Sequence, residues 1–149
     1  MQPFNMHLAG ENGIFITLHM AQKLKTALLQ VDLFWEDIQK NITLFEKKIE
    51  ALPQEVDLII LPEMFSTGFS MNAKNLAEPV EGPTFHWMRK TAVERNAAMT
   101  GSLIVAENGN YYNRLYFVYP DGSFQKYDKR HTFTLAKENE TYASGKERL

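Results

Sequence analysis

Two short segments of the sequence carry side chains that could do acid–base chemistry. Glu63 lies in the segment LPEMF at 61–65, directly after an apolar run. A carboxylate among such neighbours would be partly desolvated, which suits a general base at neutral pH. Lys129 lies in YDKRH at 127–131 and offers a fixed ammonium for an oxyanion or a substrate carboxylate. Plainer interpretations stay open, because Glu63 could face water at a strand end and Lys129 could belong to a solvated charged turn.

The residue types argue against several other kinds of site. The sequence contains no cysteine, which excludes disulfides, thiolate metal sites and a cysteine nucleophile within these 149 residues. Neither GxGxxG nor GxxxxGK occurs, so no glycine-rich phosphate loop is indicated. The four histidines include no pair at i and i+4. We therefore expect no zinc site and no metal or other cofactor.

Composition places the chain among soluble globular proteins. Its 149 residues are 44% hydrophobic and 23% charged, with a formal net charge of −2. This near-neutral balance gives no electrostatic footprint for nucleic acid or an anionic membrane, so neither is an expected partner. No run approaches the roughly 20 apolar residues that a membrane span requires. The expected location is the cytoplasm.

The first part of the chain lacks a sustained helical or strand period. Residues 1–19 include Pro3, Gly10 and Gly13, and a cleaner pattern begins at Met20. We interpret residues 1–20 as a disordered leader, or as the product of a start codon assigned too far upstream. Residues 21–149 are then the folded part.

The elements around Glu63 read as a strand, a helix and a second strand. Leu24–Val31 has the length of a buried strand, and Glu36–Leu52 is a predicted helix. The helix carries apolar residues spaced by four and three positions, at Ile38, Ile42, Phe45, Ile49 and Leu52. Val56–Leu61 is typical of a strand covered on both faces of a parallel sheet, and Pro62 ends it. This order predicts an α/β fold with Glu63 at the carboxyl end of a parallel strand, where such sheets build ligand sites.

The second half of the chain alternates strands with tight turns. A loop at 66–75 precedes a predicted helix from Pro83 to Arg95. Three strands follow, at 98–106, 112–119 and 124–128, joined by Asn-Gly and Pro-Asp-Gly turns. Consecutive hairpins beside a parallel start predict a mixed sheet. Residues 130–149 show no strand or helix pattern.

Two segments together resemble a known family. LIILPEMFSTGFSMN (58–72) and YDKRHTF (127–133), in this order and separation, resemble the nitrilase superfamily of carbon–nitrogen hydrolases. Within it the sequence is most similar to the omega-amidases, which cleave the side-chain amide of 2-oxo acid amides. The likeness runs from about Leu24 to Gly145. It implies an α-β-β-α sandwich, a Glu, Lys, Cys catalytic set and a small-molecule amide substrate.

The resemblance also implies a role for individual residues. Glu63 would be the general base that activates the cysteine, and Lys129 would stabilise the tetrahedral intermediate. Glu138 matches an additional active-site glutamate of the family. Phe65 and Phe69 would form walls of the substrate pocket, and His131 would support Lys129.

The resemblance places the family's cysteine on a strand beyond the lysine segment, and Ser144 is not a credible substitute. We therefore expect residues 21–149 to be a partial carbon–nitrogen hydrolase domain that lacks the nucleophile-bearing C-terminal half. Such a truncated omega-amidase would be inactive by itself. An alternative is a non-catalytic binding or assembly module, or one half of a split protein, which pairs with a second copy or with a complementing C-terminal fragment. A third interpretation makes Glu63 and Glu138 the acid and base of a glycosidase.

Overall fold

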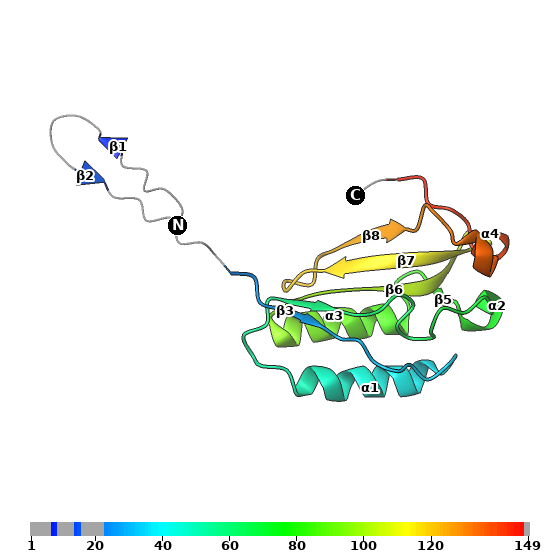
Figure 1. The fold of residues 1–149 in the computed structure, drawn as a ribbon, viewed down its shortest axis with the longest axis horizontal. Coiled ribbons are helices and arrows are strands. Elements are labelled where there is room, and N and C mark those ends of the chain that lie inside the picture. The colour runs from blue at the N-terminus through cyan, green and yellow to red at the C-terminus, as the bar shows by residue number, and fades with distance from the viewer. Residues whose placement is uncertain (1–6, 9–13, 16–22, 148–149) are drawn as a thin grey trace.

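A computed structural model describes residues 7–8, 14–15 and 23–147 (Figure 1). Within the first 20 residues it describes one antiparallel pair, β1 (His7–Leu8) with β2 (Ile14–Phe15). The interpretation of residues 1–20 as a leader otherwise lies outside the described residues.

The predicted strand, helix and strand are present in shorter form. β3 (Thr26–Leu28) pairs in parallel with β4 (Leu58–Ile60), and α1 (Ile38–Glu50) connects them. The helix begins after Asp37, whose side chain accepts a hydrogen bond from the backbone N–H of Lys40 at 3.1 Å. Lysines in its last turn complement the helix dipole. The βαβ unit is therefore confirmed.

The six-stranded sheet is mixed, as predicted. β4 and β5 (Glu78–Pro79) both pair in parallel with β6 (Ala98–Glu107). β6 pairs antiparallel with β7 (Asn110–Val118), and β7 does so with β8 (Phe124–Asp128). β7 occupies one edge of β6. Both β4 and β5 therefore pair with the other edge of β6, one after the other along its length. The segment between β4 and β5 includes Glu63 and lies beyond the end of β4 and before the start of β5.

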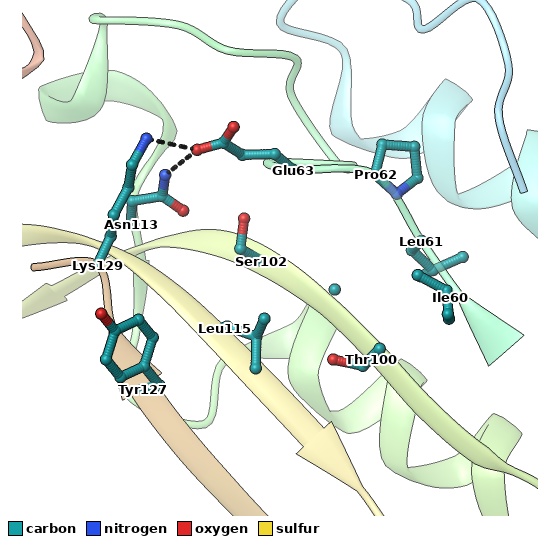
Figure 2. Close-up of a pocket in the computed structure, with 11 residues that line it drawn as sticks. Ile60, Leu61, Pro62, Glu63, Thr100, Ser102, Asn113, Leu115, Tyr127 and Lys129 are labelled. Atoms are coloured by element: carbon teal, nitrogen blue, oxygen red, sulfur yellow. Dashed lines mark hydrogen bonds and ion pairs between the residues drawn. The ribbon is translucent and has the colours of Figure 1, made fainter. Parts of the chain in front are cut away.

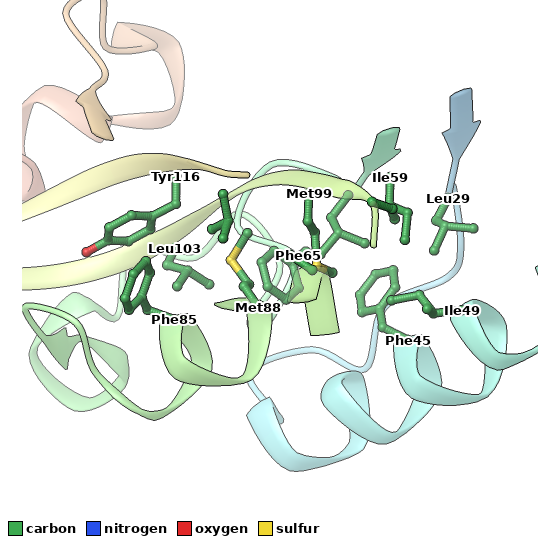
Figure 3. Close-up of a cluster of buried hydrophobic side chains, with 14 of the residues drawn as sticks. Leu29, Phe45, Ile49, Ile59, Phe65, Phe85, Met88, Met99, Leu103 and Tyr116 are labelled. Carbon is green, nitrogen blue, oxygen red and sulfur yellow. The ribbon is translucent and has the colours of Figure 1, made fainter. Parts of the chain in front are cut away.

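The main core lies between the sheet and two helices. α1 and α3 (Pro83–Arg95) cover the same face of the sheet, as Figures 1 and 3 show. Pro83 occupies the first helical turn as predicted, where its missing N–H is tolerated. The core cluster includes side chains from both helices and from the sheet, among them Phe45, Ile59, Phe85, Met88, Met99 and Tyr116.

The opposite face of the sheet has no covering helix layer among residues 23–147. Ile59 is fully buried against the helices, whereas Leu58 and Ile60 point the other way and are only partly buried. Leu24 and Leu28 are each 68% exposed. The expectation of a buried first strand, and of a second strand covered on both faces, is wrong for this reason. One helix layer and one sheet correspond to half of the sandwich that the family resemblance implies.

Short elements at the loop end of the sheet escape prediction. α2 (Ala73–Leu76) precedes β5, and a 3-10 turn at Thr134–Ala136 precedes α4 (Glu138–Thr141). Elements of three or four residues carry too little periodicity to predict and depend on tertiary contacts. Within the described part of the chain, no helix has the length and hydropathy to cross a membrane.

Candidate active site

The backbone around Glu63 is attached to the neighbouring strand β6. The N–H of Met64 donates to Oγ of Ser102 at 2.9 Å, and the N–H of Phe65 donates to the Ser102 carbonyl at 3.3 Å. Met64 has a left-handed backbone with φ of +48°, an uncommon conformation for a residue with a side chain. The chain turns sharply there, so the side chains of Met64 and Phe65 enter the interior while that of Glu63 stays 49% exposed. The apolar neighbours of Glu63 therefore point away from its carboxylate, which is half exposed.

Lys129 follows β8 and is held by its backbone on both sides. Its N–H donates to the carbonyl of Asn113 on β7 at 3.0 Å, and its carbonyl accepts from the N–H of Gly145 at 3.0 Å. Its side chain is 28% exposed. These contacts fix the root of the side chain, so the ammonium reaches the end of the sheet where Glu63 lies.

Glu138 is the first residue of α4, and its side chain is fully buried. Its Oε2 accepts a hydrogen bond from the backbone N–H of Phe133. The same oxygen lies 2.9 Å from Nζ of Lys129, and Oε1 accepts from Nδ2 of Asn113 at 3.2 Å. A buried carboxylate requires such partners, because an unpaired charge in the interior is strongly unfavourable.

The three charged side chains form one cluster. Nζ of Lys129 lies 2.8 Å from Oε1 of Glu63, a contact drawn in Figure 2. The same nitrogen lies 2.9 Å from Oε2 of Glu138. Nδ2 of Asn113 donates to that same Glu63 oxygen at 2.7 Å. One ammonium thus bridges two carboxylates, and one amide bridges them a second time. With both carboxylates ionised, the cluster carries one net negative charge.

Hydrogen bonds and ion pairs within the cluster stabilise the charged forms of Glu138 and Lys129. Burial opposes ionisation of Glu138, but hydrogen bonds from Phe133, Lys129 and Asn113 outweigh it and lower the pKa of that carboxyl. Burial likewise opposes the charged form of Lys129, yet its bonds to Glu63 and Glu138 raise the pKa of the ammonium overall. Lys129 is therefore a permanent cation near neutral pH.

A pocket of about 260 Å³ opens beside this cluster on the uncovered face of the sheet. Its apolar lining includes Ile60, Leu115 and Tyr127, and Glu63 and Lys129 lie at one end (Figure 2). A site with an apolar wall and a few convergent polar groups is typical of small-molecule binding.

The expected pocket walls, Phe65 and Phe69, and the expected support for Lys129, His131, lie in three different surroundings. The ring of Phe69 lies beside the cluster, with its centroid 5.1 Å from Nζ of Lys129. Phe65 is not a wall of this pocket, because its ring is fully buried in the main core and packs edge-on against Phe45 at 5.4 Å. His131 is exposed, and within residues 23–147 it has no hydrogen bond or ion pair to Lys129.

Asn113 is the site residue that sequence reasoning missed. It lies in the tyrosine-rich strand β7, and only 4% of it is exposed. Its neighbour Arg114 points to the opposite face, where it pairs with Asp128 at 2.6 Å and with Glu107. A polar residue inside a buried strand is the signal that could have revealed it, since a buried amide needs hydrogen-bond partners.

The geometry does not favour a glycosidase. Such enzymes hold two carboxyl groups on either side of the bond to be cleaved, with room for substrate between them. Here Lys129 and Asn113 occupy the space between Glu63 and Glu138. Within the described residues no cluster of three or more His, Asp or Glu side chains could hold a metal ion.

Glu63 after the parallel strand β4, Lys129 after β8 and Glu138 at the start of α4 meet at one end of a mixed α/β sheet, as the resemblance to the nitrilase superfamily implies. The chain belongs to the carbon–nitrogen hydrolase family, whose model, described as "Carbon-nitrogen hydrolase", matches residues 25–147. The family resemblance stated from the sequence is thereby confirmed.

Individual relatives include amidases. The chain is 43% identical over 125 residues to omega-amidase YafV of Yersinia enterocolitica, covering 84% of this chain and 48% of the relative. It is 30% identical over 128 residues to 2-oxoglutaramate amidase of Bacillus subtilis, covering 84% and 49%. Among solved structures it is similar to a CN-hydrolase superfamily protein from Xanthomonas campestris with an arsenic adduct in the active site, at 41% identity and a TM-score of 0.81, covering 85% and 48%. The chain thus spans about half the length of these relatives.

Proposed function

We propose that residues 23–147 supply the acid–base and charge-stabilising part of an amidase that acts on 2-oxo acid amides. The observation that carries the proposal is the position of Lys129 Nζ, 2.8 Å from Glu63 and 2.9 Å from Glu138. The names of the omega-amidase and 2-oxoglutaramate amidase relatives support the substrate class. A cytoplasmic setting is part of the same proposal.

In the proposed reaction, Glu63 takes the proton of a cysteine thiol and the thiolate attacks the amide carbon. Glu63 then passes the proton to the leaving nitrogen, which departs as ammonia and leaves a thioester that water hydrolyses. Because the sequence contains no cysteine, the thiol comes from outside these 149 residues.

Lys129 is suited to the negative charge that develops on the amide oxygen. Its ammonium has three N–H donors, of which Glu63 and Glu138 engage two. The third remains for the oxyanion of the tetrahedral intermediate. Glu138 holds the ammonium from the buried side, so the cation is positioned before substrate binds.

The test is a chimera in which residues 23–147 are followed by the C-terminal half of the Yersinia enterocolitica omega-amidase. Ammonia release from 2-oxoglutaramate should appear in the chimera and be absent from the 149-residue chain alone. Glu63→Gln and Lys129→Met in the chimera should each lower the rate by about a hundredfold or more. Glu140→Gln is the matched control, because this glutamate is exposed and lies two residues from Glu138. Full activity in either site variant, or a folded chimera without turnover, would contradict the proposal.

The uncovered sheet face favours a second candidate function, a binding or assembly module. Leu28 is 68% exposed there, and Leu58, Ile60 and Leu115 are only partly buried. Exposed apolar surface of this kind drives association. The partner that fits is a second β-sheet, either a complementing C-terminal fragment or another copy of this chain.

Sedimentation velocity of the 149-residue chain distinguishes these partners. A one-to-one complex on addition of the isolated C-terminal half of the Yersinia relative would identify a split protein. Dimers of the chain alone would identify self-association. A monomer that binds neither would contradict the assembly function.

A further inference from the structure

We infer that Asn113 is the positioning residue of this site: its amide sets the geometry of both carboxylates and leaves Oε2 of Glu63 as the oxygen that accepts protons. The inference rests on the proposed function and adds a residue to it. Nothing in the family resemblance assigned this residue a role.

The contacts of Asn113 converge on every charged member of the cluster. Its Nδ2 donates to Oε1 of Glu63 at 2.7 Å and to Oε1 of Glu138 at 3.2 Å. Its backbone carbonyl accepts the N–H of Lys129 at 3.0 Å. Through its Nδ2 atom, Asn113 therefore connects Glu63, 50 positions earlier in the chain, with Glu138, 25 positions later.

The chemistry of the acceptors determines which end of the amide faces the cluster. Both partners are carboxylate oxygens, which only accept while ionised, so the NH₂ end and not the carbonyl end must face them. The NH₂ group has two hydrogens, one for each carboxylate. Asparagine thus joins two like charges without adding a charge of its own.

The two oxygens of Glu63 are made unequal by this arrangement. Oε1 accepts from both Asn113 and Lys129, while Oε2 has no hydrogen-bond partner among residues 23–147. Donors on an oxygen lower its affinity for a proton. A proton taken up by Glu63 therefore binds Oε2, and the bonds to Oε1 persist in both protonation states. A base that must accept and then release a proton keeps its position throughout.

A neutral donor has an advantage over a second cation at this position. A lysine or arginine would neutralise the net negative charge of the cluster and place a second cation beside Lys129. An aliphatic residue would leave two carboxylates without one of their donors. An aspartate would add a third negative charge beside them.

The test uses the 149-residue chain itself and does not depend on turnover. In Asn113→Leu, the titration midpoint of the Glu138 carboxyl carbon, followed by NMR, should move to higher pH because the ionised form loses a donor. The exchange of the Lys129 ammonium protons with water should accelerate by about tenfold, because loss of one bond to each carboxylate loosens the ion pairs. Asn110→Leu is the matched control, since it makes the same change at an exposed position of the same strand.

Asn113→Asp is the second variant and nearly preserves the shape of the side chain. Its carboxyl can donate only when protonated. The ratio of its Lys129 proton exchange rate to that of wild type at the same pH should therefore be near one at low pH and rise as the new carboxyl ionises. Unchanged Glu138 titration and Lys129 exchange in Asn113→Leu would overturn the inference. So would a ratio of Asn113→Asp to wild-type exchange rates that does not change with pH. The chimera separates the two proposals: loss of turnover in its Glu63→Gln form with normal turnover in its Asn113→Leu form would refute only the role of Asn113.

Discussion

The ammonium of Lys129 lies 2.8 Å from Oε1 of Glu63, although the two residues are 66 positions apart in the chain. Pairing of β6 with both β4 and β7 brings them together, because it places the end of β4 and the end of β8 at the same end of the sheet. This ion pair is continued by Glu138, which is fully buried behind Lys129. The buried charge of Glu138 therefore depends on Lys129 for its cation.

Replacement of Lys129 by methionine should destabilise the chain by about 3 kcal/mol or more, because a buried carboxylate loses its cation. Urea unfolding at neutral pH measures this free energy. Lys126→Met, three residues earlier, should change the free energy of unfolding by less than about 0.5 kcal/mol, since its ion pair with Glu107 at 3.9 Å is exposed. Equal effects of the two substitutions would show that Glu138 does not depend on Lys129.

Replacement of Glu138 by glutamine should change the response of stability to acid. The folded pKa of Glu138 is depressed, so its contribution is fully present above the ordinary value of 4.5 and is lost as pH falls through the folded value. Wild type should therefore exceed Glu138→Gln in stability at pH 7, and the gap should narrow on acidification below about pH 4. Unfolding free energies across this range test the sign. A gap that widens in acid, or an equal response in Glu140→Gln, would contradict it.

Gly145→Ala should disturb the site from outside the cluster. A Cβ built on Gly145 would lie 2.0 Å from the carbonyl oxygen of Asp128, which is backbone and cannot simply move aside. Because the N–H of Gly145 binds the Lys129 carbonyl, relief of this clash displaces Lys129. We expect a loss of about 1–3 kcal/mol and altered NMR signals of the Lys129 side chain. Ser144→Ala, one residue earlier, should leave both unchanged.

Asn41→Leu tests the attachment of the loop that presents Phe69. The side chain of Asn41 is fully buried, donates to the carbonyls of Phe34 and Ser66 at 2.7 and 2.9 Å, and accepts from the N–H of Phe34 at 2.8 Å. Leucine leaves these groups without partners, which should cost about 2–4 kcal/mol. Thermal unfolding measures the loss. Gln39→Leu on the exposed side of the same helix should have little effect, and comparable losses would contradict the assignment.

Most of the order of elements is predictable from the sequence, and so are three residues that the fold brings together. Apolar spacing predicted α1, and turn residues predicted the hairpins of β6, β7 and β8. These signals are local, because one period of a helix or of a strand spans only a few residues. The family resemblance, carried by the segments around Glu63 and Lys129, selected those two residues and Glu138.

The way in which these residues meet depends on long-range contacts. Glu63 was expected among apolar neighbours, yet the turn at Met64 sends those neighbours inward and leaves its carboxylate half exposed. Glu138 has no distinctive local context, but the fold buries it completely. Asn113 became part of the site through strand register, which places its amide between the two carboxylates. Burial, register and hydrogen-bond partners depend on contacts between distant segments, and a local pattern cannot encode distances across a sheet.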